Sequence, residues 1–379
     1  MPVRRLHIVS SMGDVTERRS WSGTPFGIWQ AIARMHPDIV THDISFHWRT
    51  LGLIGKANAA MGLTSYNPGR VGVGNSLSRA RAQRVVDSAG PDADFLHFGS
   101  GHLPVRPGPG QRHYLFTDSA ACLETANPHY VAITNEKHRN ACNESDRKMV
   151  GMLDGIFTTA DYVADTFTRA YGLPPGKAIA VKSGLGRALP DPGPKDYSNG
   201  YMLFVAKQNF INKGGRLLLD AFEIVRQQRP EARLVVIGNE EDPRQADDLP
   251  RMKNTPGITF YNWDTPDYRD LVAGAALYTG PAQDEPWGII YLESLSVRTP
   301  ILGLERNAFP QFVAGGKHGF TAPEATPEAV ATTILDALSD PERLERMGAA
   351  GRAHVLAEYD WDRVAERILK SFERKADAA

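Results

Sequence analysis

The stretch DEPWGIIYLESL, residues 284–295, follows a strand pattern and itself contains a helix pattern, and the two together indicate an α/β fold. Before it, Ala276–Thr279 is a short apolar run of strand length. Pro286 and Gly288 then predict a turn, and the apolar residues after Gly288 predict a helix. The N–H groups at a helix start that follows a glycine turn form a natural cradle for a diphosphate.

Strand and helix patterns alternate around this stretch throughout the C-terminal half of the chain. The expected strands are 201–206, 233–238, 258–260, 276–279 and 300–304, and the expected helices are 214–228, 327–338, 341–356 and about 361–375. This alternation predicts a parallel sheet with helices on both faces.

The N-terminal half predicts a second sheet of the same kind. The expected strands are the apolar runs at 6–9, 95–98, 114–116, 156–157 and 179–181. Ser22–Pro25 predicts a helix start in which Thr24 is the N-cap and Pro25 the first helical residue. The segment from Asp43 to Asp92 contains glycine and polar residues throughout, and we assign it no elements.

Length and composition indicate a globular protein with two domains. A chain of 379 residues exceeds the usual size of one hydrophobic core, and 42% apolar with 23% charged residues excludes a largely disordered chain. LPDPGP, residues 189–194, has three prolines and predicts the domain boundary. A formal charge of −1 argues against a nucleic-acid binder with a global basic field.

The cysteines and the apolar runs indicate where the protein resides. Cys122 and Cys142 alone build no disulfide framework, so we expect a reducing compartment. The start MPVRRLHIVSSM has too short an apolar stretch for a signal peptide, and no run approaches a membrane span. We therefore expect a cytoplasmic protein, soluble or at most lying on the inner face of the membrane.

Several motif matches fail on inspection. GLPPGKA, residues 172–178, has one residue too few for a P-loop and lacks its Ser or Thr, and GRVGVG, residues 69–74, has no flanking strand and helix. No H-E-x-x-H pair or G-x-S-x-G elbow occurs, and two cysteines cannot build a structural zinc site.

Glu285 and Glu293 lie eight residues apart across the glycine turn, Glu285 in the loop and Glu293 more than one turn inside the helix. Two Glu at this spacing occur by chance in most proteins. The whole segment, however, resembles the E-x7-E signature of glycosyltransferase family 4, including the glycine and the Thr299–Pro300 turn after the helix. The resemblance implies that Glu285 contacts the sugar of the donor and Glu293 its ribose. It also implies that the backbone of Gly288, Ile289 and Ile290 binds the diphosphate.

VAKQNFINKGG, residues 205–215, is similar to a second stretch of that family, with a basic residue after a strand and a Lys-Gly pair six positions later. Lys207 and Lys213 would converge beyond the strand end and neutralise the diphosphate and the departing nucleotide. The family commonly has Arg at the first position, so Lys207 keeps the charge but not the bidentate fork. The alternative is a pair of solvated surface lysines.

The N-terminal half resembles the family more loosely. Gly23 and Thr24 resemble its first glycine turn, which binds the donor, and His97 resembles a histidine near the donor sugar. The family's more critical histidine usually comes two positions later, where this chain has Gly99, so His97 or His102 would replace it or be structural. Thr117–Asp118 resembles a further cleft position, and residues 359–362 resemble the start of a terminal segment that returns to the first domain.

This resemblance implies an α/β protein of GT-B architecture, with two Rossmann-like parallel-sheet domains facing a cleft and a C-terminal helix crossing back. Residues 1–190 with 361–379 would bind the acceptor, and residues 198–360 the nucleotide sugar, with UDP or GDP as the expected nucleotide. A retaining, metal-independent sugar transfer to a glycan, lipid-linked or small-molecule hydroxyl acceptor is implied, with no cofactor and no nucleic acid. The alternatives are a nucleotide-sugar epimerase or hydrolase and a non-catalytic sugar-nucleotide binding protein.

Overall fold

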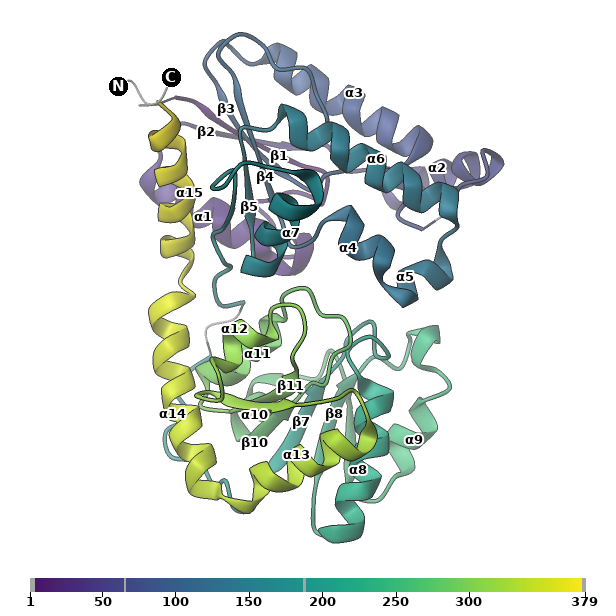
Figure 1. The fold of residues 1–379 in the computed structure, drawn as a ribbon, viewed down its shortest axis with the longest axis vertical. Helices are drawn as coiled ribbons and strands as arrows, with labels where there is room; N and C mark the ends of the chain where they lie inside the picture. The colour runs from purple at the N-terminus through teal and green to yellow at the C-terminus, as the bar shows by residue number, and fades with distance from the viewer. Residues whose placement is uncertain (1–3, 65, 187–188, 377–379) are drawn as a thin grey trace. The chain divides into compact units, whose positions relative to one another are not determined.

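The computed structural model describes residues 4–64, 66–186 and 189–376, which form two compact units. Unit 1 extends to Gly184 and resumes at Trp361, and unit 2 is Leu185–Asp360 (Figure 1). The proline-rich stretch 189–194, expected as the domain boundary, belongs to unit 2. Its Asp191 carboxylate pairs with the guanidinium groups of Arg298 at 2.8 Å and Arg352 at 3.1 Å, so this stretch is tied down rather than loose.

Unit 1 contains, in its described part, a parallel sheet of six strands in the order β2-β1-β3-β4-β5-β6. The strands are β1 (Leu6–Ser10), β2 (Ile39–Asp43), β3 (Asp94–Phe98), β4 (Arg112–Thr117), β5 (Gly155–Thr158) and β6 (Ala178–Ala180). The helices are η1 (Ser20–Gly23), α1 (Thr24–Met35), α2 (Trp48–Ala60), η2 (Pro68–Arg70), α3 (Gly72–Ser88), α4 (Ala121–Ala126), α5 (Pro128–Ile133), α6 (Glu136–Met152), α7 (Asp161–Tyr171) and α15 (Trp361–Ala376).

Helix α15 completes the core of unit 1 although it follows unit 2 in the chain. Its Val364 and Ile368 are fully buried with Ile28 and Ile32 of α1 against one face of the sheet. The indole of Trp361 fits only because α1 has a glycine there: a Cβ on Gly27 would lie 2.3 Å from the ring. Figure 1 shows α15 alongside α1, as the resemblance implied for the returning helix.

Unit 2 contains a second parallel sheet, whose six described strands have the order β12-β11-β10-β7-β8-β9. The strands are β7 (Tyr201–Val205), β8 (Leu234–Gly238), β9 (Ile258–Asn262), β10 (Ala275–Thr279), β11 (Ile301–Leu304) and β12 (Gly319–Ala322). The helices are α8 (Gly215–Gln228), η3 (Pro243–Gln245), α9 (Leu249–Asn254), α10 (Tyr268–Gly274), α11 (Ile289–Ser296), α12 (Phe309–Val313), α13 (Pro327–Ser339) and α14 (Pro341–Glu358).

The largest core of unit 2 lies between its sheet and the helices α8 and α13. Phe204 of β7 packs there with Phe222 of α8 and Ile334 of α13, all of them fully buried. The two doubly covered parallel sheets confirm the fold class that the alternating sequence patterns predicted. The start of α1 was predicted wrongly in detail, because Gly23 is its N-cap and Thr24 is already helical.

Candidate functional site

The candidate donor site of unit 2 lies where its strand order reverses. After β7 the chain adds β8 and β9 on one side of the sheet, and then β10 on the other side of β7. Ligands of open parallel sheets bind beyond the carboxyl ends of the strands at this kind of switch point. Lys207 and Lys213 follow the carboxyl end of β7, and Glu285 and Gly288 follow that of β10.

The loops after β7 and β10 are joined by their backbones. The carbonyl of Asn212 accepts hydrogen bonds from the N–H groups of Gln283, at 2.7 Å, and Asp284, at 3.1 Å. Gly214 has φ +82°, and a Cβ there would lie 2.1 Å from the carbonyl oxygen of Pro281, so only glycine allows this approach. The joined loops therefore fix the residues that follow Asn212 beside those that follow Asp284.

Lys213 and Glu285 form an ion pair at this junction. The Lys213 ammonium donates to the Glu285 carboxylate over 2.5 Å, and the two side chains are 26% and 18% exposed. Partial burial weakens solvent screening, so this pair is stronger than an ordinary surface ion pair. The structure thus brings together two residues that the sequence predicted as site residues.

Gly288 is the N-cap of helix α11 and ends the loop that carries Glu285. Its φ of +85° is left-handed, and a Cβ there would lie 2.4 Å from the ring of Tyr291. Glycine is therefore required here on two grounds, conformation and space. The helix starts at Ile289 and Ile290, whose backbone N–H groups belong to the first turn, which lacks partners within the helix.

Glu293 lies on the second turn of α11 and is only 6% exposed. The hydroxyl group of Tyr268, the first residue of α10, donates to Oε2 of Glu293 over 2.6 Å. A buried carboxylate needs such donors because its desolvation is otherwise unfavourable. The two carboxylates of the predicted signature thus have different surroundings, since Glu285 pairs with a cation and Glu293 with a phenol.

Lys207 has a different partner from Lys213. Its ammonium nitrogen lies 3.5 Å from the centre of the Trp263 ring, a cation–π contact. Trp263 follows the last residue of β9, whereas Glu285 follows β10 on the opposite side of β7. The two lysines that we expected to converge therefore contact loops on either side of the central strand.

In unit 1, Gly23 and Thr24 end an unusual turn in the loop after β1. Trp21, Ser22 and Gly23 have φ values of +38°, +56° and +85°, so three consecutive residues adopt positive φ. Such a turn orients successive N–H groups toward one side, the arrangement that favours an anion. Thr24 is buried, and no side-chain hydrogen bond caps the helix at Gly23. The roles of Gly23 and Thr24 in donor binding stay predictions.

His97 lies in the middle of a row of three buried imidazoles. Its Nδ1 lies 2.9 Å from Nε2 of His102, and its Nε2 lies 3.0 Å from Nδ1 of His113. Burial, with the two neighbouring imidazoles adding to it, lowers the pKa of His97 well below its usual value. All three rings are shielded from solvent, so in this structure neither His97 nor His102 presents a ring nitrogen to a ligand. A catalytic role for His97 stays a prediction.

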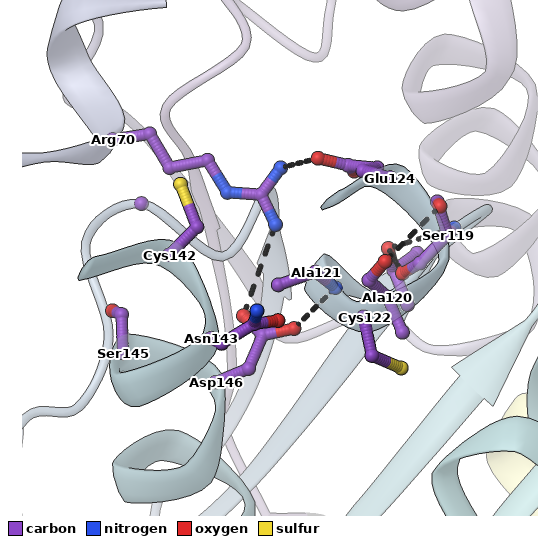
Figure 2. Close-up of polar contacts among 12 residues, drawn as sticks. Arg70, Ser119, Ala120, Ala121, Cys122, Glu124, Cys142, Asn143, Ser145 and Asp146 are labelled. Carbon is purple, nitrogen blue, oxygen red and sulfur yellow. Dashed lines mark hydrogen bonds and ion pairs between the residues drawn. The ribbon is translucent and has the colours of Figure 1, made fainter. Parts of the chain in front are cut away.

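A buried ion cluster that the sequence analysis missed ties η2 to α4 and α6 (Figure 2). The Arg70 guanidinium pairs with the Glu124 carboxylate and lies 3.8 Å from Oδ1 of Asp146. The other oxygen of Asp146 accepts the N–H of Ala121 over 2.7 Å, at the start of α4. Arg70 lies 54 and 76 residues from its two partners in the chain, and no spacing pattern marks such a contact.

The described residues contain neither a cluster of metal-ligating side chains nor a helix that could cross a membrane. In residues 4–64, 66–186 and 189–376 no group of three or more His, Cys, Asp or Glu side chains is placed to hold a metal ion. None of the helices in this described part is both long enough and apolar enough to cross a membrane.

Comparisons with known proteins match part of the chain to one family model. Residues 192–354 match the family model described as glycosyl transferases group 1. The chain is similar to the D-inositol 3-phosphate glycosyltransferase of Segniliparus rotundus, with 26% identity over 240 residues, 59% of this chain and 53% of that protein.

A second relative is the GDP-mannose-dependent monoacylated alpha-(1-6)-phosphatidylinositol monomannoside mannosyltransferase of Corynebacterium glutamicum, 28% identical over 166 residues, 41% of this chain and 42% of that protein. The matches thus span about half the length of these relatives. The solved sucrose-phosphate synthase of Thermosynechococcus elongatus superposes with a TM-score of 0.72 and 14% identity, over 99% of this chain and 100% of that one. That likeness shows the fold.

Proposed function

We propose that this chain is a group 1 glycosyl transferase of GT-B fold and that it transfers a sugar from a nucleotide-sugar donor to a hydroxyl acceptor with retention of configuration. The observation that carries the proposal is the Lys213–Glu285 pair, held by joined loops at the switch point of the unit 2 sheet. It combines a cation for a diphosphate with a carboxylate for sugar hydroxyls, beside the glycine-started helix α11.

The roles follow from the charge of each group. Lys213, Lys207 and the N-terminus of α11 would stabilise the negative charge that develops on the leaving diphosphate. Glu285 would accept hydrogen bonds from the hydroxyl groups of the transferred sugar. Glu293, whose Oε2 already accepts the Tyr268 hydroxyl, would accept them from the ribose.

The reaction that fits these roles is a front-face displacement. The bond between the anomeric carbon and the phosphate oxygen breaks, and the acceptor oxygen bonds to the same face of that carbon. The acceptor proton passes to the leaving phosphate oxygen. We assign no protein nucleophile and no metal, and full activity in the presence of EDTA would support this proposal. Loss of activity that magnesium or manganese restores would contradict it.

The donor nucleotide is the first thing to measure. We expect one of UDP-, GDP-, ADP- or CDP-sugars to raise the melting temperature of the protein, with UDP or GDP as the nucleotide, because bound ligand stabilises the folded state by mass action. Products formed from that donor with and without candidate acceptors then separate the alternatives. An altered sugar or its release without acceptor indicates an epimerase or hydrolase, and binding without any turnover indicates a non-catalytic binding protein.

We further propose a glycan or lipid-linked acceptor and a peripheral contact with a membrane through α2. This helix carries Arg49 and Lys56 and no acidic residue, and its Trp48 and Leu53 side chains are among the most exposed apolar groups described. Basic residues beside exposed Trp and Leu favour an anionic lipid surface. Sedimentation with phosphatidylglycerol vesicles, compared between wild type and Trp48→Ser, tests this contact. Equal sedimentation of both would contradict it.

A further inference from the structure

Trp263 is a large aromatic side chain at the ligand-binding edge of unit 2. It follows directly on Asn262, the last residue of β9, and is 38% exposed. A single exposed apolar residue needs no explanation by itself. Trp263 differs from such a residue because one face of its indole is occupied by the ammonium group of Lys207, 3.5 Å from the ring centre.

The position of Lys207 defines where Trp263 lies in the site. Lys207 comes two residues after β7, and β8 separates β7 from β9 in the sheet. Neighbouring strands are about 4.8 Å apart, so the Lys207 side chain extends across the carboxyl end of β8 to reach Trp263. The indole therefore lies at the edge of the sheet formed by the carboxyl ends of its strands, where the proposed diphosphate site also lies. Lys207, a charged residue of that site, contacts the indole directly.

A second contact relates Trp263 to Glu293. Tyr268, five residues after Trp263, donates its hydroxyl to the Glu293 carboxylate. One short segment, residues 263–268, therefore begins with the exposed indole of Trp263 and ends with the phenol of Tyr268. That phenol is bound to Glu293, the residue that we propose binds the ribose. In a nucleotide the base is attached to the ribose on the side away from the diphosphate. A ribose bound at Glu293 thus places its base near this segment.

We propose that Trp263 stacks on the nucleobase of the donor, which makes it a binding residue of the same site that the proposed function uses. The inference rests on that proposed function. Aromatic side chains stack on every base because each base has a π face, so Trp263 contributes affinity for the nucleoside without selecting one base. Its contact with Lys207 adds a second effect, because the indole holds that ammonium group near the phosphates.

The two effects separate when a ligand with a base is compared with one without. We would measure the binding of UDP, GDP, ADP, CDP and inorganic pyrophosphate by calorimetry to wild type, Trp263→Leu and Trp263→Phe. Trp263→Leu should weaken the best nucleoside diphosphate about tenfold or more, the effect of losing one stacked base. Pyrophosphate should bind within about twofold of wild type. Trp263→Phe keeps a π face and should recover most of the loss.

Two control variants complete the design. Lys207→Met should weaken pyrophosphate and nucleotides alike, since it removes a charge and not a stacking surface. Leu356→Ala changes an exposed apolar residue of α14 in unit 2 and should change neither affinity. In addition, nucleotide should change the tryptophan fluorescence of wild type, and this change should be largely lost in Trp263→Leu.

Each contrary result has a separate meaning. If Trp263→Leu binds nucleotides as wild type does, Trp263 is no stacking residue and this inference alone is wrong. If that variant loses nucleotide and pyrophosphate affinity equally, Trp263 acts only by holding Lys207, and the stacking proposal is again overturned. If no nucleoside diphosphate or nucleotide sugar binds the folded wild type, the proposed function fails and this inference with it.

Discussion

Glu285 and Glu293 differ in their surroundings, and we expect substitutions at the two positions to change different kinetic constants. Glu285 is paired with Lys213 and would contact the sugar, where charge and geometry change along the reaction. Glu293 would contact the ribose, which stays the same from ground state to transition state. Interactions strengthened at the reacting centre affect kcat, whereas uniform binding affects KM. Glu285→Gln should therefore depress kcat strongly, and Glu293→Gln should mainly raise donor KM, by about tenfold for a lost bond worth roughly 1.4 kcal/mol.

Steady-state kinetics and melting temperatures of the Glu285→Gln and Glu293→Gln variants test this prediction. Gln at position 293 can still accept the Tyr268 hydroxyl, so the fold should persist. Glu223→Gln, which changes a carboxylate paired with Arg251 on the surface of α8, is the matched control and should leave both kinetic constants unchanged. If kcat fell only in Glu293→Gln, the two roles would be reversed. A lower melting temperature with normal kinetics would make Glu293 a structural residue.

Lys213 pairs with Glu285, and removing the Lys213 side chain affects the site in two ways. Lys213→Ala takes away a cation from the diphosphate and leaves the Glu285 carboxylate without its ion partner. We expect turnover to fall by about 10² or more, since loss of one such charge-stabilising donor typically costs a few kcal/mol. Lys213→Arg keeps the charge and should retain much more activity. Wild-type kinetics in Lys213→Ala would remove the diphosphate role.

The sequence marked Lys213 and Glu285 as candidate site residues, but it did not indicate that they contact each other. Lys213 and Glu285 are 72 residues apart. They meet because β7 and β10 are neighbours in the sheet although two strands separate them in the chain. Trp263 gave no signal, because a single aromatic residue after a strand is ordinary. The sequence likewise did not indicate that His102 and His113 contact His97, because the pairing of β3 with β4 places His113 there and a turn after β3 places His102.

At the scale of elements, burial decided what the sequence could predict. Strand β8 is buried along its whole length and appears in the sequence as a continuous apolar run. Strand β2, which is only partly buried at a sheet edge, was missed. Strand β12 was missed for another reason: it is mostly buried, but its four residues GFTA include a single large apolar side chain. Helices α2 and α3 were also missed in the segment from Asp43 to Asp92. Helix α2 exposes Trp48 and Leu53, so its apolar residues do not follow one buried face.

The missed segment is fixed by the ion cluster around Arg70, and this predicts a stability effect. Arg70→Gln leaves the almost fully buried Asp146 carboxylate without its cation. Removing one partner of a buried ion pair costs about 3–5 kcal/mol, so unit 1 should be destabilised by roughly that amount. Arg70→Lys should recover part of the loss because it restores the charge without the planar fork. Thermal unfolding together with hydrogen exchange of α4 and α6 measures the effect.

The control for this prediction is Arg169→Gln, which breaks an exposed pair with Asp165 on α7. Exposed pairs contribute about 0–1 kcal/mol, so this variant should unfold like wild type. Nucleotide binding to unit 2 should persist in Arg70→Gln, because the cluster belongs to unit 1. Equal stability of Arg70→Gln and Arg169→Gln would show that the cluster does not hold the segment in place.

At the scale of the whole molecule, each unit has its own core and therefore its own stability. The core of unit 1 includes α15, whose buried Val364, Ala365 and Ile368 share a cluster with Ile28 and Ile32 of α1, more than 300 positions earlier in the chain. Unit 2 is continuous in sequence between Leu185 and Asp360. A condition that acts on one core alone should therefore unfold one unit before the other, and the buried histidines of unit 1 provide such a condition.

The pKa values of His97, His102 and His113, three buried histidines of unit 1, determine how the stability of this unit changes with pH. Burial lowers the pKa of His102 to about 3 and that of His113 to about 4, and that of His97 falls well below 6.5. In the unfolded chain all three titrate near 6.5. Between about pH 4 and pH 6.5 the unfolded state binds more protons than the folded state. The contribution of these histidines to the free energy of unfolding is therefore fully present above about pH 6.5 and is lost as the pH falls toward 4. Each histidine contributes a slope of about 1.4 kcal/mol per pH unit, so the three together reach about 4 kcal/mol per unit.

We therefore predict that unit 1 unfolds selectively on mild acidification, and one substitution tests the cause. His113→Phe keeps a flat ring stacked on Phe95, now 4.5 Å between centres, but removes one titrating group. The slope of unit 1 stability between about pH 4.5 and 6 should fall by about a third, even though the loss of the bond to His97 lowers stability at every pH. Hydrogen exchange of the β3 and β4 amides measures this stability for unit 1 alone, and His47→Gln, at an exposed histidine, should keep the wild-type slope. Carboxylates also protonate in this range, but they are common to both variants, so only the difference in slope is diagnostic. An unchanged slope in His113→Phe would mean that the imidazole row does not govern the acid sensitivity of unit 1.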